Sequence, residues 1–326
     1  MRLAVSAVVT TVTVRAGRRS VEVSNAEKVL YPDDGITKAD LAEYYEHVAA
    51  RMLPHLRERP IAMERYPDGI DGGRLFQKNV SRHFPDWVAR ARVKKVGGFV
   101  THVIVDQPAT LVYLANQACI TLHTFLSTVD RIQNPDQLIF DLDPPGAEFQ
   151  LARKVALDLR AVLEDELGLV SFVKTTGGDG LHIVVPLDRS EEFDAVRAFA
   201  SDVGALLVKR DPERVTMEQR KNRRGNRLFL DVMRNAYAQT AVAPYSARAR
   251  RKAPVAMPID WDDLRDSKLR PERYTIATVQ RRIAKEPDPW TAMAKKAQGL
   301  AEAEKRIPEL LGAAGATRVH PAAPNP

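Results

Sequence analysis

The sequence predicts a mixed α/β fold. Two observations predict it: strand-like apolar runs alternate with amphipathic helical stretches, and glycine-containing turns join several of the runs. A third observation, the absence of any break in composition, favours one unit over several. We therefore expect a single domain over residues 1–311, in which two lobes are allowed, and a disordered tail over residues 312–326.

The first half of the chain predicts a hairpin, two helices and a strand. Valines alternate with polar residues on either side of "RAGRR", in "VVTTVTV" and "SVEVS", which predicts a β-hairpin over residues 8–24. Thr37 is a predicted helix cap, because Asp40 follows in the first turn and apolar side chains then recur at helical spacing. Residues 97–106 predict a strand, and the mostly apolar residues 108–127 predict one buried helix.

The second half of the chain alternates strands and helices. Strands are predicted at residues 136–143 and 226–235, and a strand–glycine turn–strand unit is predicted at 171–187. Amphipathic helices are predicted over residues 148–167 and, from a serine cap, over residues 190–210. The stretches 275–284 and 290–311 also have helical patterns. This order of elements is typical of a mixed α/β chain.

Composition and charge restrict the class of protein without identifying it. The chain has 326 residues, of which 44% are hydrophobic and 28% charged, so it can bury an ample core. Its formal net charge is +7. This modest excess of base is compatible with a polyanionic partner, although a basic enzyme without nucleic acid has the same composition.

The sequence predicts a cytoplasmic protein with no membrane partner. No apolar run approaches the ~20 residues that span a membrane. The only candidate for a signal peptide is the N-terminal stretch, which threonines interrupt and which alternates like a strand. The single cysteine, Cys119, excludes an intramolecular disulfide, and no Cys/His cluster has the spacing of a structural zinc site.

Two carboxylates interrupt a run that otherwise has the pattern of a buried strand. In "LIFDLDPP", Asp141 and Asp143 are two residues apart, so in a strand their side chains share one face. A second apolar run, "RLFLDVMRN", places Asp231 in the same kind of position. Asp143 alone has a structural alternative, because aspartate before Pro-Pro-Gly favours a turn. Buried carboxylates without compensation are costly, and Mg²⁺ or Mn²⁺ ions bound by all three would remove that cost.

A glycine-rich turn, "KTTGGDGLHIVVPL", lies between the two carboxylate segments. Its glycines allow a tight turn whose backbone N–H groups can bind an anion. In that case His182, with the hydroxyls of Thr175 and Thr176, would hold a triphosphate. The structural alternative is a glycine β-hairpin with a hydrogen-bonded core histidine, and the local sequence leaves both open.

These segments, in this order, resemble the polymerase domain of bacterial ligase D and its stand-alone relatives. That family belongs to the primase-polymerases of the archaeo-eukaryotic primase superfamily. The stretches that carry the resemblance are "RPIAMERYPDGI", "FQKN", "PDWV", "LANQACITLH", "DLDP", "GGDGLHIVVPL", "FLDVMRN" and "TAVAPYS". The resemblance implies a primase-polymerase fold, in which a central mixed or antiparallel sheet bears the carboxylates and helices flank it.

The resemblance also implies a role for each matched position. The metal-binding and catalytic carboxylates would be Asp141, Asp143 and Asp231. The nucleotide pocket would contain His123, Thr176, His182 and Arg248. A downstream DNA 5′-phosphate would bind to Asn25, Lys28 and Lys38, and Phe76 would stack on the template strand. Two positions depart from the family pattern: Asp179 replaces a lysine of the glycine turn, and Leu75 replaces a second phenylalanine.

The expected function is template-dependent nucleotidyl transfer during DNA repair. Two divalent ions, Mn²⁺ or Mg²⁺, would align a primer 3′-hydroxyl on the α-phosphate of an NTP or dNTP. The expected partners are gapped or broken duplex DNA with a 5′-phosphate, a separate ATP-dependent DNA ligase and an end-binding protein. Two alternatives stay open: a non-catalytic DNA-end-binding module, and a metal-dependent nuclease. The sequence is compatible with end joining, gap filling and priming alike. The basic run 220–227 is either a solvated loop or a contact with nucleic acid.

Overall fold

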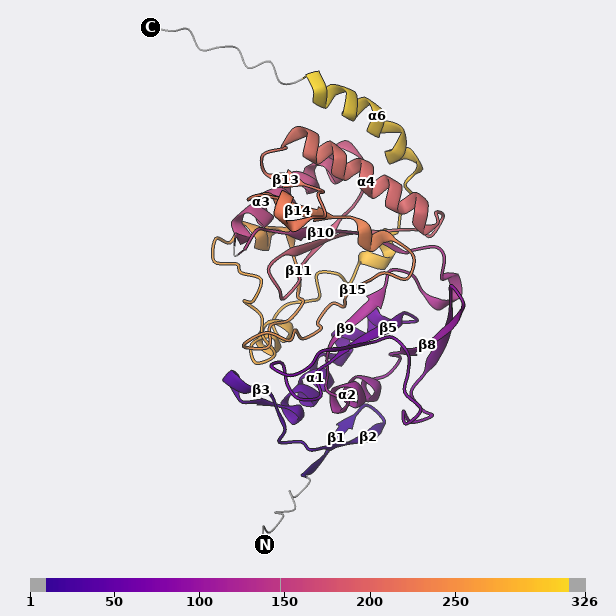
Figure 1. The fold of residues 1–326 in the computed structure, drawn as a ribbon, viewed down its shortest axis with the longest axis vertical. Helices are drawn as coiled ribbons and strands as arrows, with labels where there is room; N and C mark the ends of the chain where they lie inside the picture. The colour runs from indigo at the N-terminus through magenta and orange to yellow at the C-terminus, as the bar shows by residue number, and fades with distance from the viewer. Residues whose placement is uncertain (1–9, 147, 317–326) are drawn as a thin grey trace.

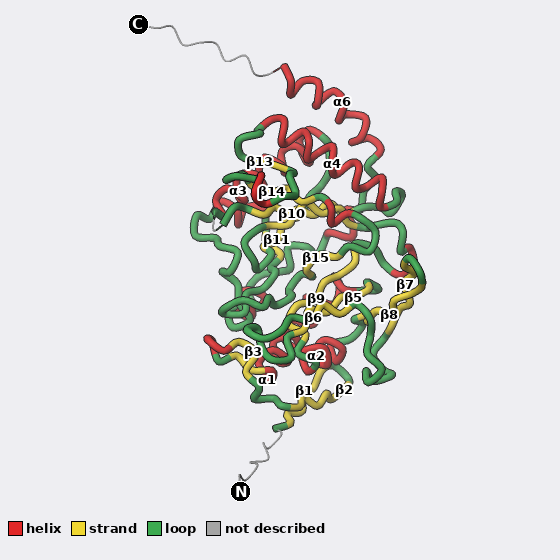
Figure 2. The backbone as a smooth tube through the Cα atoms, viewed as in Figure 1, coloured by secondary structure: helices red, strands yellow, loops and turns green. Residues whose placement is uncertain are grey.

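The computed structural model describes residues 10–146 and 148–316 and has a mixed α/β fold, as the sequence predicts. Two large sheets organise it, one formed mainly by the first half of the chain and one by the second (Figures 1 and 2). The first sheet has the strand order β15–β9–β5–β8–β7, and β6 pairs with β5. Its strands are β5 (Pro60–Arg65), β6 (Leu75–Gln77), β7 (Arg90–Lys95), β8 (Gly98–Ile104), β9 (Cys119–Phe125) and β15 (Thr240–Val242).

Short strands and two helices complete the first half of the structure. The predicted hairpin is confirmed as β1 (Thr11–Ala16) and β2 (Arg19–Ser24), and β3 (Val29–Tyr31) pairs with β4 (Ile36–Thr37). Helix α1 (Lys38–Leu56) begins at the predicted cap: Thr37 Oγ1 accepts from the Asp40 N–H, and Asp40 Oδ2 accepts from the Thr37 N–H. Helix α2 (Pro108–Asn116) packs against α1.

The prediction of one helix over residues 108–127 is wrong in its second half. Helix α2 ends at Asn116, and Ala118 adopts a left-handed conformation with a φ of 54° that directs the chain into β9. The β9 sequence "CITLHTF" contains β-branched and aromatic residues, which fit a strand. Strand β9 is buried on both faces, since every residue except the half-buried His123 is buried, and its apolar run could not be distinguished from a helix by periodicity.

The second sheet carries the predicted carboxylates and has the order β13–β14–β10–β12–β11–β16. Its strands are β10 (Gln137–Asp143), β11 (Phe172–Thr175), β12 (Leu181–Pro186), β13 (Val215–Thr216), β14 (Leu228–Asp231) and β16 (Pro258–Ile259). Helices α3 (Phe149–Ala161) and α4 (Phe193–Arg210) pack on β10, and Figure 1 shows both on the side of this sheet that faces away from the first sheet.

Several predicted helix boundaries in the second half of the chain need correction. Helix α4 begins at Phe193 because Ser190 does not cap it; the Ser190 hydroxyl donates to Asp188 Oδ1 instead. The helix predicted over residues 148–167 is α3 followed by a π-helical turn, η3 (Val162–Glu166). The helix predicted over residues 275–284 is the short α5 (Val279–Ile283). The helix predicted over residues 290–311 is divided into the 3₁₀ turn η7 (Met293–Lys296) and α6 (Ala301–Ala316). Helix α6 packs on α4 and runs past the predicted start of the tail at residue 312, while residues 317–326 lie outside the described residues.

The two sheets share one continuous hydrophobic cluster. It includes Tyr45 of α1 and Leu122 of β9 from the first half, and Phe140 of β10 and Val185 of β12 from the second. The N-terminal stretch weighed as a signal peptide begins outside the described residues. Among the helices that are described, none is both long enough and apolar enough to cross a membrane.

Candidate active site between the two sheets

Four ionisable residues form a row across the second sheet. On neighbouring strands, Lys174 of β11 lies opposite His182 of β12, His182 opposite Asp141 of β10, and Asp141 opposite Asp231 of β14. Residues directly opposite one another in antiparallel strands project their side chains from the same face. The fold thus places the ionisable row, Lys174–His182–Asp141–Asp231, on one face, although these residues come from segments far apart in the chain.

The three predicted carboxylates come together at one end of this row. Asp143 lies two residues after Asp141 on the same face, at the exposed end of β10. Partial desolvation together with the charges of Asp141 and Asp231 raises the pKa of Asp143 to about 7. Asp231 Oδ1 accepts a hydrogen bond of 2.8 Å from the Met233 N–H. Negative charge is therefore concentrated here, as the sequence predicts for a metal site.

Arg234 is the cation that compensates this charge in the structure. Its Nε donates to Asp141 Oδ2 and lies 4.0 Å from Asp231 Oδ2. With the guanidinium in this position, no group of three or more His, Cys, Asp or Glu side chains within residues 10–146 and 148–316 is gathered as a metal cage. The chemical type of these residues nevertheless suits a divalent ion. All three candidate ligands are carboxylates, and Asp141 Oδ1 is buried without a hydrogen-bond partner in the described structure.

His182 is a neutral, buried side chain beside Asp141. Burial and the charge of Lys174 lower the pKa of His182 to about 4. Its Nε2 lies 3.3 Å from Asp141 Oδ1, and its Nδ1 has no hydrogen-bond partner within the part of the chain that the structure describes. The glycine hairpin of the structural alternative is present, since β11 pairs with β12, and His182 is a buried residue whose Nε2 contacts Asp141.

The glycine turn (residues 177–180) packs directly on the carboxylate strand. A Cβ added to Gly180 would lie 1.9 Å from the Leu142 carbonyl oxygen, so only glycine fits there. Thr176 Oγ1 accepts from the N–H groups of Gly178 and Gly180 at 3.1 and 3.3 Å. In the structure these two N–H groups, which could bind an anion in one of the two alternatives, are bound to the threonine hydroxyl. Thr175 Oγ1 accepts from the Met257 N–H instead of facing the turn.

Two further predicted residues reach this place from outside the second sheet. Arg248 follows β15, is largely buried, and donates from Nη1 to the Thr176 carbonyl at 3.3 Å. His123 projects from β9 of the first sheet, and its Nε2 lies 2.8 Å from Glu64 Oε2. The site therefore lies where the two sheets face each other, and each sheet contributes to it.

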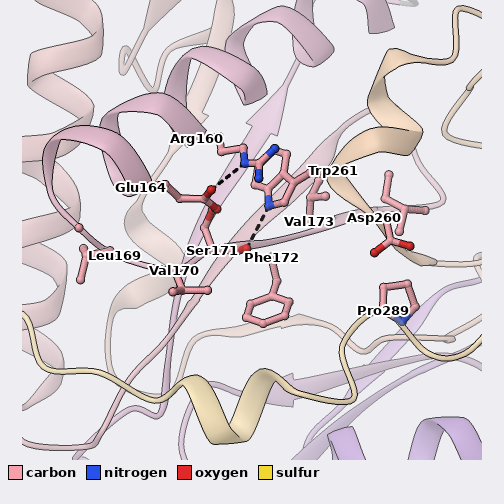
Figure 3. Close-up of a pocket in the computed structure, with 12 residues that line it drawn as sticks. Arg160, Glu164, Leu169, Val170, Ser171, Phe172, Val173, Asp260, Trp261 and Pro289 are labelled. Carbon is pink, nitrogen blue, oxygen red and sulfur yellow. Dashed lines mark hydrogen bonds and ion pairs between the residues drawn. The ribbon is translucent and has the colours of Figure 1, made fainter.

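These side chains line a small cavity of about 120 Å³, the site cavity. Its lining contains the predicted residues His123, Asp141, Asp143, Thr176, His182 and Arg248, together with Gly178, Asp179, Arg234, Val242 and Arg250. A larger cavity of about 330 Å³ lies beside Trp261 (Figure 3). In it, Arg160 Nε donates to Glu164 and Trp261 Nε1 to the Ser171 carbonyl, so its polar groups bind one another. No predicted site residue lines that cavity.

Phe76 stands at the edge of the site. Its ring is 42% exposed on β6 and packs edge-on against His123, with ring centroids 5.5 Å apart. The preceding Leu75 is 51% exposed. An exposed aromatic ring can stack on a base, and template stacking by Phe76 stays a prediction.

The predicted 5′-phosphate residues also come together. Strands β3 and β4 pair, and the Lys38 N–H donates to the Lys28 carbonyl at 2.9 Å. Burial and the charge of Lys28 lower the pKa of Lys38, whose Nζ donates to Asn116. Asn25 precedes them, and its carbonyl accepts from the Lys28 N–H. Lys28 Nζ pairs with the exposed Asp68 Oδ1 at 3.2 Å, so a phosphate at these two lysines would replace that carboxylate.

The loop after β3 connects this lysine pair to the site cavity. Tyr31 Oη donates to the Arg248 carbonyl at 3.0 Å. The side chain of Asp34 accepts from the Lys252 N–H. The arginine loop (residues 248–254) is thereby held against the segment that carries the lysines.

Sequence reasoning missed Lys174 and Arg234. Lys174 interrupts the apolar strand run "SFVKT" just as Asp141 interrupts "LIFDL", so the same argument would have found it. Arg234 is three residues after Asp231, but the turn after β14 and not any periodicity brings it to Asp141. The basic run 220–227 forms an exposed turn, including η4 (Lys221–Arg223), just before β14.

Replacing Lys174 with methionine is expected to stabilise the fold. Lys174 is 1% exposed, its Nζ has no hydrogen-bond partner in the described structure, and burial followed by the charge of Arg248 holds its pKa well below the usual range. Removing a buried, uncompensated amine should raise the free energy of unfolding by about 1–4 kcal/mol. Chemical denaturation of both proteins measures the difference.

The effect of Lys174→Met should depend on pH. The unfolded state binds the lysine proton more tightly than the folded state, so stability of the natural protein rises with pH between the lowered pKa and the unperturbed value near 10.4. The advantage of Lys174→Met should shrink over that alkaline range. An advantage that stays constant with pH would show that Lys174 is not an uncompensated amine.

Comparison with known proteins assigns this arrangement to a family. Residues 37–290 match the LigD primase-polymerase domain. The LigD protein of Mycobacterium tuberculosis, a multifunctional non-homologous end joining DNA repair protein, is 36% identical over 282 residues, which are 84% of this chain and 37% of that protein. The LigD protein of Pseudomonas aeruginosa is 31% identical over 294 residues, which are 90% of this chain and 35% of that protein. The chain therefore spans about a third of the length of these relatives.

A solved structure agrees with the sequence comparison. The polymerase domain of Mycobacterium tuberculosis ligase D, in complex with DNA, superimposes with a TM-score of 0.79 and 33% sequence identity. The match covers 85% of this chain and 99% of that domain. The fold, the order of the motifs and the sequence similarity agree, and the chain belongs to the LigD primase-polymerase domain family.

Proposed function

We propose that this protein is a template-dependent nucleotidyltransferase that extends a primer 3′-hydroxyl at gaps or breaks in DNA. The observation that carries the proposal is the position of three carboxylates beside the site cavity, with Asp141 directly opposite Asp231 and Asp143 on the same face. The family relationship supports it, because the solved relative is a polymerase domain in complex with DNA.

Asp141, Asp143 and Asp231 would hold the divalent ions. When bound, such ions neutralise charge on the attacking and leaving oxygens of phosphoryl transfer. Arg234 must then leave Asp141, and its 35% exposed side chain has solvent into which it can move. Asp231 Oδ1 is held by the Met233 N–H, which leaves Oδ2 to orient the primer hydroxyl.

The other residues of the site cavity would bind the nucleotide. The Arg248 side chain donates from Nη1 to the Thr176 carbonyl, so its other N–H groups can bind phosphate oxygens. His182 is neutral and can donate a hydrogen bond without adding charge. His123 is oriented by Glu64 and packs against Phe76. A nucleotide bound at His123 would therefore lie beside a template base stacked on Phe76.

The substrate would be gapped or broken duplex DNA with a downstream 5′-phosphate. Lys28 and Lys38 would bind that phosphate, and the contact of Tyr31 with Arg248 would set its distance from the site cavity. Mn²⁺ or Mg²⁺, and NTPs or dNTPs, are the proposed metals and nucleotides. The proposed partners are a separate ATP-dependent DNA ligase and an end-binding protein.

Incubation of a labelled primer on a gapped duplex with nucleotides and each metal tests this proposal. The expected result is lengthening of the primer that depends on the template base and stops when the metal is chelated. Shortening of the primer would favour a nuclease built on the same carboxylates. DNA binding with neither change would favour a non-catalytic end-binding module.

A further inference from the structure

An ion pair at the mouth of the site cavity joins the glycine turn to the arginine loop. Arg250 donates from Nη1 to Asp179 Oδ1 and from Nη2 to Asp179 Oδ2, both at 2.7 Å. The carboxylate therefore binds both terminal nitrogens of the guanidinium, which is the geometry in which arginine also binds phosphate. Both side chains are about half-exposed, at 54% for Asp179 and 47% for Arg250.

The same pair separates two cavities. Asp179 and Arg250 line the site cavity, and with Gly178 they also line an adjoining cavity of about 370 Å³. The adjoining cavity contains two further arginines, Arg251 and Arg270. Breaking the Asp179–Arg250 pair would therefore change the charges that line the cavity proposed to hold the nucleotide.

The pair also determines how much positive charge the site cavity offers an anion. Three arginines line it, and Arg234 is bound to Asp141. Arg250 is bound at both terminal nitrogens to Asp179. In the part of the chain that the structure describes, the Arg248 side chain is bound to a backbone carbonyl and to no carboxylate. Of the three arginines that line the site cavity, two are therefore paired with carboxylates in the structure. An incoming triphosphate would find the charge of Arg248 unpaired.

We propose that Asp179 sets the affinity for nucleotide, because its carboxylate occupies Arg250 in the place of phosphate oxygens and the triphosphate must displace it. The inference rests on the proposed function, since it concerns the same site. A half-exposed ion pair is weak, whereas a metal-bound triphosphate presents several oxygens, so the exchange is feasible in the folded protein. Once displaced, Asp179 turns to solvent and Arg250 binds the nucleotide.

The variant Asp179→Asn tests the inference, because it keeps the shape of the side chain and removes its charge. We expect the Kd for a non-hydrolysable nucleoside triphosphate, measured by calorimetry without DNA at low ionic strength, to fall about fivefold, which is the factor that an exposed ion pair of this strength implies. The KM for nucleotide in primer extension should fall by a similar factor. High salt should reduce both effects.

Two further variants show whether the effect acts through Arg250. Asp33→Asn is the matched control, because Asp33 pairs with the neighbouring Arg251 at 3.2 Å and neither residue lines the site cavity. It should change the Kd less than twofold by the same measure. In an Arg250→Gln background, Asp179→Asn should no longer improve binding, because the cation that it releases is missing.

Each outcome decides one claim. The role of Asp179 would be overturned by any of three results. The first is a Kd that Asp179→Asn leaves unchanged, and the second is an equally large fall in Kd from Asp33→Asn. The third is a full fall in Kd from Asp179→Asn in the Arg250→Gln background. Failure of the natural protein to extend any primer would instead overturn the proposed function. The calorimetric Kd still measures the Asp179 effect in that case.

Discussion

Asp141→Ala is expected to reduce metal-dependent primer extension by about a thousandfold or more. Asp141 occupies the centre of the ionisable row, opposite both His182 and Asp231, and shares its face with Asp143. Charge stabilisation by metal ions is worth several kcal/mol in phosphoryl transfer, and each 1.36 kcal/mol corresponds to a factor of ten in rate. Single-turnover extension of a labelled primer measures the loss.

DNA binding should survive the same substitution, because Asp141 is only 2% exposed and lies away from the lysine pair. Asp141→Asn is the companion variant, because asparagine has the same shape as aspartate and can still accept the hydrogen bond from Arg234. It should therefore disturb the fold less than alanine does. Asp130→Ala removes a carboxylate from another arginine, Arg189, outside the site, and should leave extension intact. Extension by Asp141→Ala at the natural rate, in a preparation free of other polymerases, would disprove the metal assignment.

The double variant Lys28→Ala, Lys38→Ala is expected to abolish the preference for a gap with a downstream 5′-phosphate. Lys28 directly precedes β3, Lys38 begins α1 directly after β4, and the Lys38 N–H is bound to the Lys28 carbonyl. A hydrogen bond to a charged group contributes about 1.5–3 kcal/mol, so the loss of even one such bond should reduce the preference by about 10- to 100-fold. The ratio of extension rates on phosphorylated and unphosphorylated gaps measures it.

The matched control removes the same charge elsewhere. Lys295 and Lys296 are adjacent, exposed and outside the predicted site, so Lys295→Ala, Lys296→Ala should keep the preference. Retention of the preference by the Lys28→Ala, Lys38→Ala protein would mean that these lysines bind no phosphate. An equal loss in both double variants would point to net charge alone.

The carboxylates could be predicted from the sequence because they violate a local pattern. An aspartate inside an apolar strand has a high cost, so Asp141 and Asp231 stood out without knowledge of the fold. Their convergence depends on strand order, which placed β14 beside β10. The resemblance to a known family, and not periodicity, supplied the nucleotide and phosphate residues.

Other features depend on tertiary structure and were not predictable in this way. Strand β9 was mistaken for the end of a helix, since burial on both faces removes the alternation that marks a strand. Its correction matters for function, because the strand is what directs His123 towards the site cavity. Arg234 and Arg250 reach their carboxylates through turns, and Asp179 could be identified as unusual but not as bound to Arg250.

The most direct test of the account is single-nucleotide addition by the natural protein on a short gapped duplex, with and without a downstream 5′-phosphate. Mn²⁺ and Mg²⁺, and ribo- and deoxyribonucleotides, should be supplied separately. We predict metal-dependent addition of the templated nucleotide, faster on the phosphorylated gap, because the Tyr31–Arg248 contact joins the lysine pair to the site cavity. Tight DNA binding without addition under any of these conditions would contradict the account.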